Sequence, residues 1–168
     1  MDPTWERNFS QRFAELDADV LRPNEALPVS IKVRVDSGCF HREHSPRAYA
    51  IIDDALSRTD LRAERARFVE HESGPELLAW ITLGAATLNL TTGIINLVVT
   101  ILRARRDGIK SGDHPAAPLV LIVRGHDPKD EYREQRLLEI APDDPIDADD
   151  IGNRIDAAIT ELFGHTDK

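Results

Sequence analysis

The sequence predicts an α+β fold, with a small mixed sheet of about four strands, flanking helices and one long uncharged central helix. Segments with helical periodicity alternate with segments of strand periodicity along the chain, and 41% of the residues are hydrophobic and 30% charged. A chain of 168 residues can bury one sizeable core. We divide it into an amphipathic N-terminal helix and linker (1–27), a single α+β domain (28–163) and a tail (164–168).

The first half of the chain alternates helix and strand. Apolar residues recur every three or four positions near the N-terminus, which predicts an amphipathic helix: Trp5, Phe9, Phe13, Leu16 and Val20. From Val29 to Val35 apolar and polar residues alternate, as in a half-buried strand. Ser45 before Pro46 predicts the start of a helix, because proline suits the first helical position. A short strand is predicted between Arg65 and His71.

The segment from Leu77 to Leu102 carries no charged side chain, and we predict that it is one long helix. Basic residues follow it, where they suit the negative end of the helix dipole: Arg103, Arg105 and Arg106. On a helical wheel, six small or uncharged polar residues fall within one narrow arc: Thr82, Ala86, Asn89, Gly93, Asn96 and Thr100. The arc predicts an assembly face or the face of a membrane helix.

Two interpretations of this helix stay open. In a bilayer, the small residues would let helices pack closely and the asparagines would hydrogen-bond across the contact, as in an oligomeric span or a pore wall. In water, the helix would pack its apolar side on the sheet and present the polar arc to a neighbouring subunit. The threonines, asparagines and glycines dilute its hydrophobicity, which favours a soluble or peripheral state over a span.

The last third of the chain predicts a hairpin and a helix. The unbroken apolar run at Leu119–Val123 indicates a strand buried on both faces, and Arg136–Ile140 is its hairpin partner. Acidic residues then open an amphipathic helix, where they complement the positive end of its dipole: Asp147, Asp149 and Asp150. Gly164 ends this helix.

Composition excludes several classes of function. A net charge of −9 argues against nucleic acid as a partner, because binding a phosphate backbone needs a basic surface. The single cysteine, Cys39, excludes an intramolecular disulfide and favours a reducing compartment, so we expect a cytoplasmic protein. The N-terminus has neither a basic leader nor an apolar run, and we expect no secretory signal.

The sequence assigns no catalytic, cofactor-binding or metal-binding residue. Cys39, His41 and His44 are close in sequence and of the types that zinc prefers, but no second ligand pair follows. A fourth ligand would have to be a remote histidine, such as His71, His114 or His126. A polar loop with a half-buried thiol is therefore the preferred interpretation. An enzyme assembled from dispersed residues is a weaker alternative.

The succession of elements resembles a known family. A strand at Val29–Val35, a helix at Ala48–Leu56 and a strand at Ala66–Glu72 lead through Gly74-Pro75 into a Gly/Ala/Leu-rich helix, which ends in Arg103-Ala104-Arg105-Arg106 before a strand at Leu119–Val123. This order resembles the effector-associated constant component domains of bacterial multi-component conflict (defence) systems over about residues 28–163. Members are predicted to be non-enzymatic components encoded with variable effectors, often proteases, and with NTPase regulators.

The resemblance implies an adaptor or effector-associated component of a defence system. The polar arc of the long helix predicts that this component assembles with itself or with an effector protein through that helix. The alternative is a membrane-inserting or pore-forming effector that uses helix 77–102 at the inner membrane. We expect a protein partner or self-association, no cofactor and no nucleic acid.

Overall fold

A five-stranded antiparallel sheet forms the centre of the computed structural model, in the order β2-β3-β1-β4-β5. The structure describes residues 3–19, 26–36, 38–82, 90–114 and 116–164. Its strands are β1 (Ala26–Val35), β2 (Ala66–Val69), β3 (Glu76–Thr82), β4 (Leu119–His126) and β5 (Tyr132–Ile140). Its helices are α1 (Pro3–Asp19), α2 (Pro46–Ser57), α3 (Thr92–Lys110) and α4 (Ala148–Phe163).

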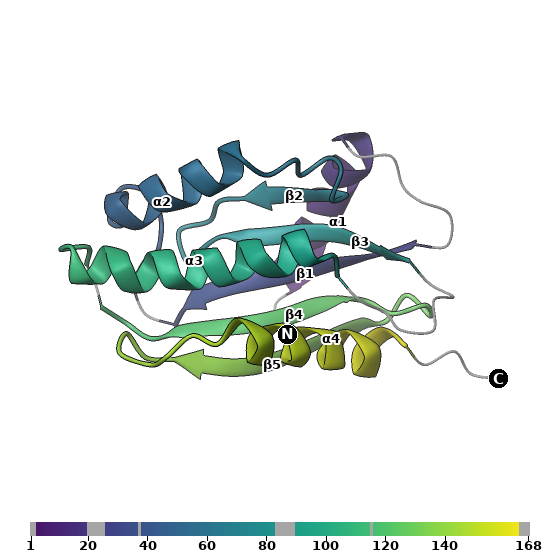
Figure 1. Cartoon of the computed structure of the whole chain (residues 1–168). Helices are drawn as coiled ribbons and strands as arrows, with labels where there is room; N and C mark the ends of the chain where they lie inside the picture. The colour runs from purple at the N-terminus through teal and green to yellow at the C-terminus, as the bar shows by residue number, and fades with distance from the viewer. Residues whose placement is uncertain (1–2, 20–25, 37, 83–89, 115, 165–168) are drawn as a thin grey trace.

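Helices cover the two faces of the sheet unequally. Figure 1 shows α2, α3 and α4 in front of the sheet and α1 behind it. The three front helices and the sheet enclose the main hydrophobic core. Behind the sheet, a smaller apolar cluster joins α1 to β1 and β3: Phe9, Phe13, Leu16, Ala26, Leu78 and Trp80. Outside this cluster, the second face carries the charged residues Lys32, Arg34 and Arg124 as well as the buried apolar residues Val120 and Ile122.

β1 is the central strand and supplies residues to both faces. Its alternate residues from Leu27 to Val35 are buried in the main core. The residues between them face the side of α1, and Lys32 and Arg34 line a cleft there. The predicted strand at Val29–Val35 is therefore confirmed, and β1 begins at Ala26, before the predicted domain boundary at residue 28.

The long helix predicted over Leu77–Leu102 is wrong. The beginning of this segment is strand β3, which ends at Thr82, and helix α3 begins at Thr92. Thr91 caps α3, since its side chain accepts a hydrogen bond from the Ile94 amide. In the part of the chain that the structure describes, no helix is long and apolar enough to cross a membrane.

Burial on both faces explains why β3 resembles part of an apolar helix. Leu77 and Ala79 face the main core, whereas Leu78 and Trp80 lie under α1. A strand that is covered on both sides lacks the polar alternation of a half-exposed strand, so its apolar run does not distinguish strand from helix.

The predicted sheet needs two corrections. It has five strands and not about four, because the predicted long helix included the residues of β3. It is antiparallel and not mixed, because β1 pairs antiparallel with both β3 and β4, and the β2–β3 and β4–β5 pairs are antiparallel too. The predicted N-terminal helix, the helix after Ser45, the last hairpin and the C-terminal helix are confirmed.

Candidate functional site

A buried carboxylate, that of Glu76, lies between α1 and the sheet. Its side chain is 0% exposed. Glu76 Oε2 accepts hydrogen bonds from Ser30 Oγ at 2.5 Å and Arg124 Nη2 at 2.8 Å. Glu76 Oε1 accepts one from Arg12 Nε at 2.6 Å and lies 3.1 Å from His71 Nε2. The partners come from β1, β4, α1 and the β2–β3 connection, so this one side chain joins four parts of the chain.

The register of the strands brings these groups together. Lys32 of β1 pairs directly with Glu76 of β3. On the other side of β1, Ser30 pairs with Arg124 of β4. Because directly opposite residues on neighbouring strands share a face, the three strands place their charged side chains on the side of α1.

Opposing effects set the ionisation of Glu76. Burial would raise the pKa of Glu76, because a carboxylate loses its hydration inside a protein. Hydrogen bonds from His71 and Arg12, together with the charge of Arg124, outweigh this effect and hold the pKa of Glu76 well below its ordinary range. The carboxylate therefore stays ionised and keeps the surrounding cations in place.

Lys32 is a buried amine whose charge changes close to neutral pH. Desolvation lowers the pKa of Lys32 to about 7, although the charge of Glu76 acts in the opposite direction. Lys32 Nζ donates a hydrogen bond to the Gly74 carbonyl at 2.5 Å. Gly74 has a φ of +139°, and a Cβ there would lie 2.0 Å from the Val33 carbonyl oxygen. Glycine is thus required for this turn to approach β1.

These residues border an open cleft of about 570 Å³ between α1 and the sheet. Its lining is mainly polar and cationic: Asn8, Gln11, Arg12, Glu15, Lys32, Arg34, His71, Ser73 and Arg124. Four of these residues are arginine or lysine, and three of them pair with carboxylates: Arg12 and Arg124 with Glu76, and Arg34 with Asp36. Guanidinium groups bind carboxylates and phosphates with two parallel hydrogen bonds, so the cleft gathers groups of the kind that bind anions.

Sequence reasoning did not find this cleft. Its signals are single charged residues beside apolar runs: Glu76 precedes the run of β3, Arg124 follows that of β4, and Lys32 lies within β1. Each residue by itself is typical of a strand end or of the polar face of a strand. The order of the strands, which local patterns do not reveal, brings them together.

The six residues predicted to form one assembly face do not share a helix. Thr82 is the last residue of β3, Ala86 and Asn89 lie outside the described residues, and the other three lie on α3: Gly93, Asn96 and Thr100. Of those three, Asn96 is exposed, whereas Gly93 and Thr100 are half-buried. The helical wheel assumed a rotation of 100° per residue over the whole segment, but the segment begins as a strand. The six residues therefore do not lie on one continuous surface.

The basic residues predicted to flank the long helix lie within α3, which continues to Lys110. Their environments differ. The Arg103 guanidinium donates a hydrogen bond at 3.3 Å to a backbone carbonyl just before α4. Arg105 is buried and donates one to Ser45 Oγ at 3.0 Å. Arg106 is half-buried. The three arginines therefore do not form a single basic patch.

The loop between β1 and α2 brings together Cys39, His41 and His44. One ligand atom from each of the three lies within 4.8 Å of those of the others. Cys39 Sγ lies 2.6 Å from His44 Nδ1, and the two imidazole rings are 5.0 Å apart between centroids. The loop is thus a cluster of metal-ligand side chains as well as the polar loop that the sequence predicts.

The histidines considered as a fourth ligand have other surroundings. His71 contacts Glu76, and His126 packs against the rings of Phe9 and Tyr132. The His114 amide donates a hydrogen bond to the His44 carbonyl at 3.4 Å, so the backbone of His114 is next to the cluster. Its side chain is not among the converging ligand atoms.

No family model, curated protein or solved structure matches this chain.

Proposed function

We propose that this chain is a non-enzymatic adaptor of a bacterial conflict system in the cytoplasm, and that it binds an acidic segment of a protein partner in the cleft between α1 and the sheet. One observation supports this proposal above others. The cleft gathers Arg12, Lys32, Arg34 and Arg124, although the chain has a net charge of −9. Such a cluster of cations attracts anions, and an incoming anion would compete there with Glu76 and Asp36.

The arrangement of the cations suits a carboxylate ligand. Arg12 and Arg124 are held by Glu76, with side chains 12% and 4% exposed. Because they are already ordered, binding would cost little further side-chain entropy. Arg34 lines the same cleft and is more exposed, at 36%, and it pairs with the exposed Asp36 at 3.3 Å. Arg34 is therefore the most accessible cation of the cleft, and an incoming acidic side chain would replace Asp36 as its partner.

The partner is expected among the proteins encoded beside this one. Each neighbour would be purified and its Kd for the chain measured, with wild type compared with Arg34→Glu. The reversed charge should weaken binding at least about tenfold, which corresponds to about 1.4 kcal/mol. Arg58→Glu is a matched control, because Arg58 is an exposed arginine at the end of α2, and α2 lies on the opposite face of the sheet.

Two outcomes would contradict the proposal. If no neighbour binds the wild-type chain, the adaptor role is wrong. If a neighbour binds but Arg34→Glu and Arg58→Glu have the same effect, the cleft is not the binding site. Binding through the cleft should also weaken as the salt concentration rises, because salt screens charge pairs at a surface.

A further inference from the structure

The loop between β1 and α2 has chemistry that the proposed adaptor function does not use. A thiol and two imidazoles, from Cys39, His41 and His44, converge within 4.8 Å. In a tetrahedral zinc site the ligand atoms lie about 2.0–2.3 Å from the metal, which places them about 3.3–3.6 Å from one another. The separations in this cluster include 2.6 Å between Cys39 Sγ and His44 Nδ1 and extend to at most 4.8 Å. Small side-chain rotations are enough to reach the metal-bound spacing.

We propose that Cys39, His41 and His44 bind one zinc ion, with water in the fourth position. Sulfur and imidazole nitrogen are the ligands that zinc prefers, whereas magnesium and calcium prefer oxygen. No carboxylate belongs to this cluster as the structure describes it. The donor set therefore selects zinc over the hard divalent cations.

The backbone of the loop is held in place before any metal binds. Phe40, between two of the ligands, is completely buried. Its amide donates a hydrogen bond to the Glu72 carbonyl at 2.7 Å, and its carbonyl accepts one from Tyr49 Oη at 3.3 Å. The Ser45 amide donates to the His41 carbonyl at 2.9 Å, which closes the turn that carries both histidines. A fixed loop lowers the entropy cost of bringing three ligands to one ion.

The two imidazoles differ in how far they are prepared for a metal. His41 Nδ1 accepts a hydrogen bond from the Glu43 amide at 3.2 Å, and zinc binding by His41 would replace this hydrogen bond. His44 Nδ1 faces the sulfur of Cys39. Zinc binding would release the thiol proton of Cys39 to solvent, as metal coordination by cysteine requires.

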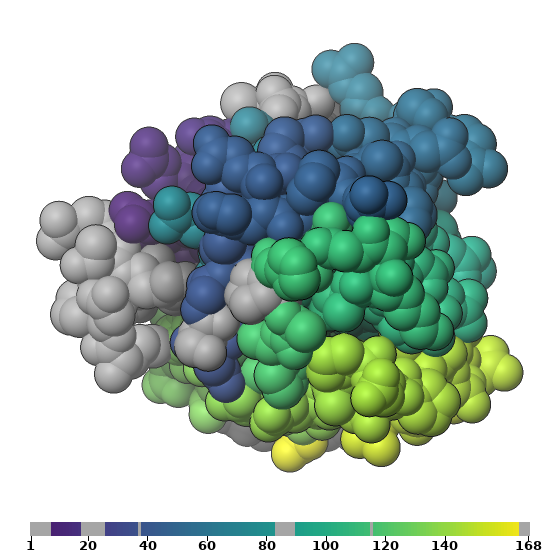
Figure 2. Space-filling model, turned by 90° about the vertical axis from the view of Figure 1, so that its left-hand side faces the viewer, coloured from purple at the N-terminus to yellow at the C-terminus, as the bar shows by residue number. Residues whose placement is uncertain are grey.

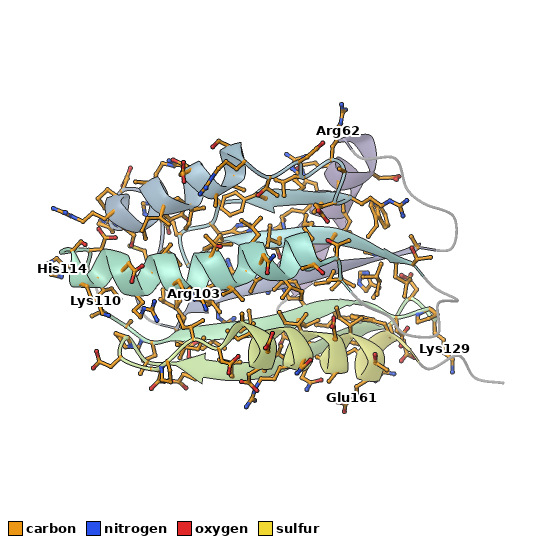
Figure 3. All side chains as sticks on the ribbon, viewed as in Figure 1. Arg62, Arg103, Lys110, His114, Lys129 and Glu161 are labelled. Atoms are coloured by element: carbon orange, nitrogen blue, oxygen red, sulfur yellow. The ribbon has the colours of Figure 1, made fainter. Side chains whose placement is uncertain are left out.

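The fourth position is assigned to water because, among the residues that the structure describes, no further ligand atom converges on the three. His114 lies at the same end of the molecule as Lys110 (Figure 3), near the loop, with its amide bonded to the His44 carbonyl. Figure 2 views this end, where the blue residues of the loop and α2 lie against the green residues at the end of α3. His114 is thus the matched control: a histidine next to the cluster that is not one of its proposed ligands.

The test is a titration of the full-length, chelator-treated protein with Zn²⁺, in competition with a chromophoric chelator. Wild type should bind one equivalent. Cys39→Ser and His44→Ala should each weaken binding at least about a hundredfold, since loss of an outer-shell group alone costs 10–100-fold. His114→Ala should change the affinity less than about threefold. Co²⁺ in place of Zn²⁺ should give a thiolate-to-metal charge-transfer band in wild type that is absent in Cys39→Ser.

Two results would overturn the proposal. One is that wild type binds less than one equivalent of Zn²⁺. The other is that Cys39→Ser has the same Zn²⁺ affinity and the same Co²⁺ spectrum as wild type. A hundredfold loss in His114→Ala would overturn the assignment of water to the fourth position. Circular dichroism of each metal-free variant shows whether the variant keeps the fold. If His44→Ala does not fold, Cys39→Ser still tests the proposal, because serine is close to cysteine in size.

Discussion

The buried Glu76 network contributes little net stability, but the loss of Glu76 alone is expected to destabilise the fold. Its carboxylate loses its hydration completely, and the hydrogen bonds from Arg12, Ser30 and Arg124 compensate for that loss. A buried ion pair contributes little net stability compared with an apolar replacement of the whole network. Removal of one member is different, because the others stay buried without a counter-charge.

Glu76→Gln is therefore expected to lower the free energy of unfolding by about 3–5 kcal/mol. Urea denaturation at neutral pH measures the change. Glu139→Gln is the control, because this carboxylate of β5 is 61% exposed, and its loss should change stability by less than about 0.5 kcal/mol. If Glu76→Gln and Glu139→Gln have the same free energy of unfolding, the negative charge of Glu76 does not stabilise the fold.

Lys32 predicts a dependence of stability on pH. Its pKa is about 7 in the folded chain and has an ordinary value of 10.5. Between these values the unfolded chain binds a proton that the folded chain does not, so the free energy of unfolding rises with pH across this window. Relative to Lys32→Met, wild type should gain up to about 2–3 kcal/mol between pH 7 and pH 9. Parallel stability curves for the two proteins would contradict this prediction.

At the scale of the elements, local pattern was sufficient wherever one face of an element is apolar and the other polar. The helices α1 and α4 and strand β1 follow this rule, and their positions agree with the sequence. β4 is buried on both faces, but its apolar run is short enough to indicate a strand. β3 does not follow it, because both of its faces are covered. The capping residue Thr91 was the local signal that a new helix begins inside the uncharged segment.

Thr91→Ala tests the observed start of α3. Thr91 caps the helix and also donates a hydrogen bond to the Glu64 carboxylate. Its replacement should destabilise the chain by about 1 kcal/mol, whereas Thr91→Ser should be close to wild type. In the interior of a continuous helix over 77–102, alanine would instead be favoured over threonine by intrinsic propensity. The sign of the change in thermal unfolding therefore distinguishes the two structures.

The contact between α2 and α3 requires a small residue at Gly108. Asp113, just after α3, accepts hydrogen bonds from the amides of Arg47 at 3.2 Å and Ala48 at 2.9 Å, and so caps α2. A Cβ on Gly108 would lie 2.2 Å from Asp113 Oδ2 and 2.9 Å from the Ala48 amide nitrogen. The side chain of Ser45, the residue just before α2, makes no such capping bond.

Gly108→Ala should therefore destabilise the chain by about 1–3 kcal/mol, although alanine is the better helix former. Gly152→Ala on α4 is the control, because its nearest neighbour is the Ile95 methyl Cγ2 at 3.2 Å, the end of a flexible side chain. Chemical denaturation of both variants measures the difference. A stabilised Gly108→Ala would mean that α2 and α3 are not in close contact in solution.

At the scale of the whole molecule, α1 acts as the cover of the second face of the sheet. It buries Leu78 and Trp80 and supplies Arg12 to the cleft. A chain that begins at residue 26 should expose this face, so its tryptophan emission should shift to longer wavelength and it should bind a hydrophobic dye. Trp80 would be the only tryptophan left, since the other is Trp5. Unchanged emission would show that α1 does not cover Trp80.

The two candidate sites differ in how far the sequence predicts them. Cys39, His41 and His44 lie on one short loop, so the sequence brings them together as zinc-type ligands, but without a second ligand pair it favoured a polar loop, and only the structure shows that the side chains converge. The lining of the cleft combines α1 with two strands, β1 and β4, and with the β2–β3 connection, which are far apart in the sequence. Such a site depends on strand order and register, and no short window of residues contains it.

The edges of the sheet have a consequence for how this protein behaves at high concentration. One edge is β2, only four residues long. The other is β5, whose exposed residues include charges of both signs: Arg133, Glu134, Arg136 and Glu139. A short or highly charged edge is a poor template for another strand. We therefore expect the folded chain to resist growth into amyloid-like fibrils. β4 lies between β1 and β5, so its backbone cannot pair with another chain until the sheet opens.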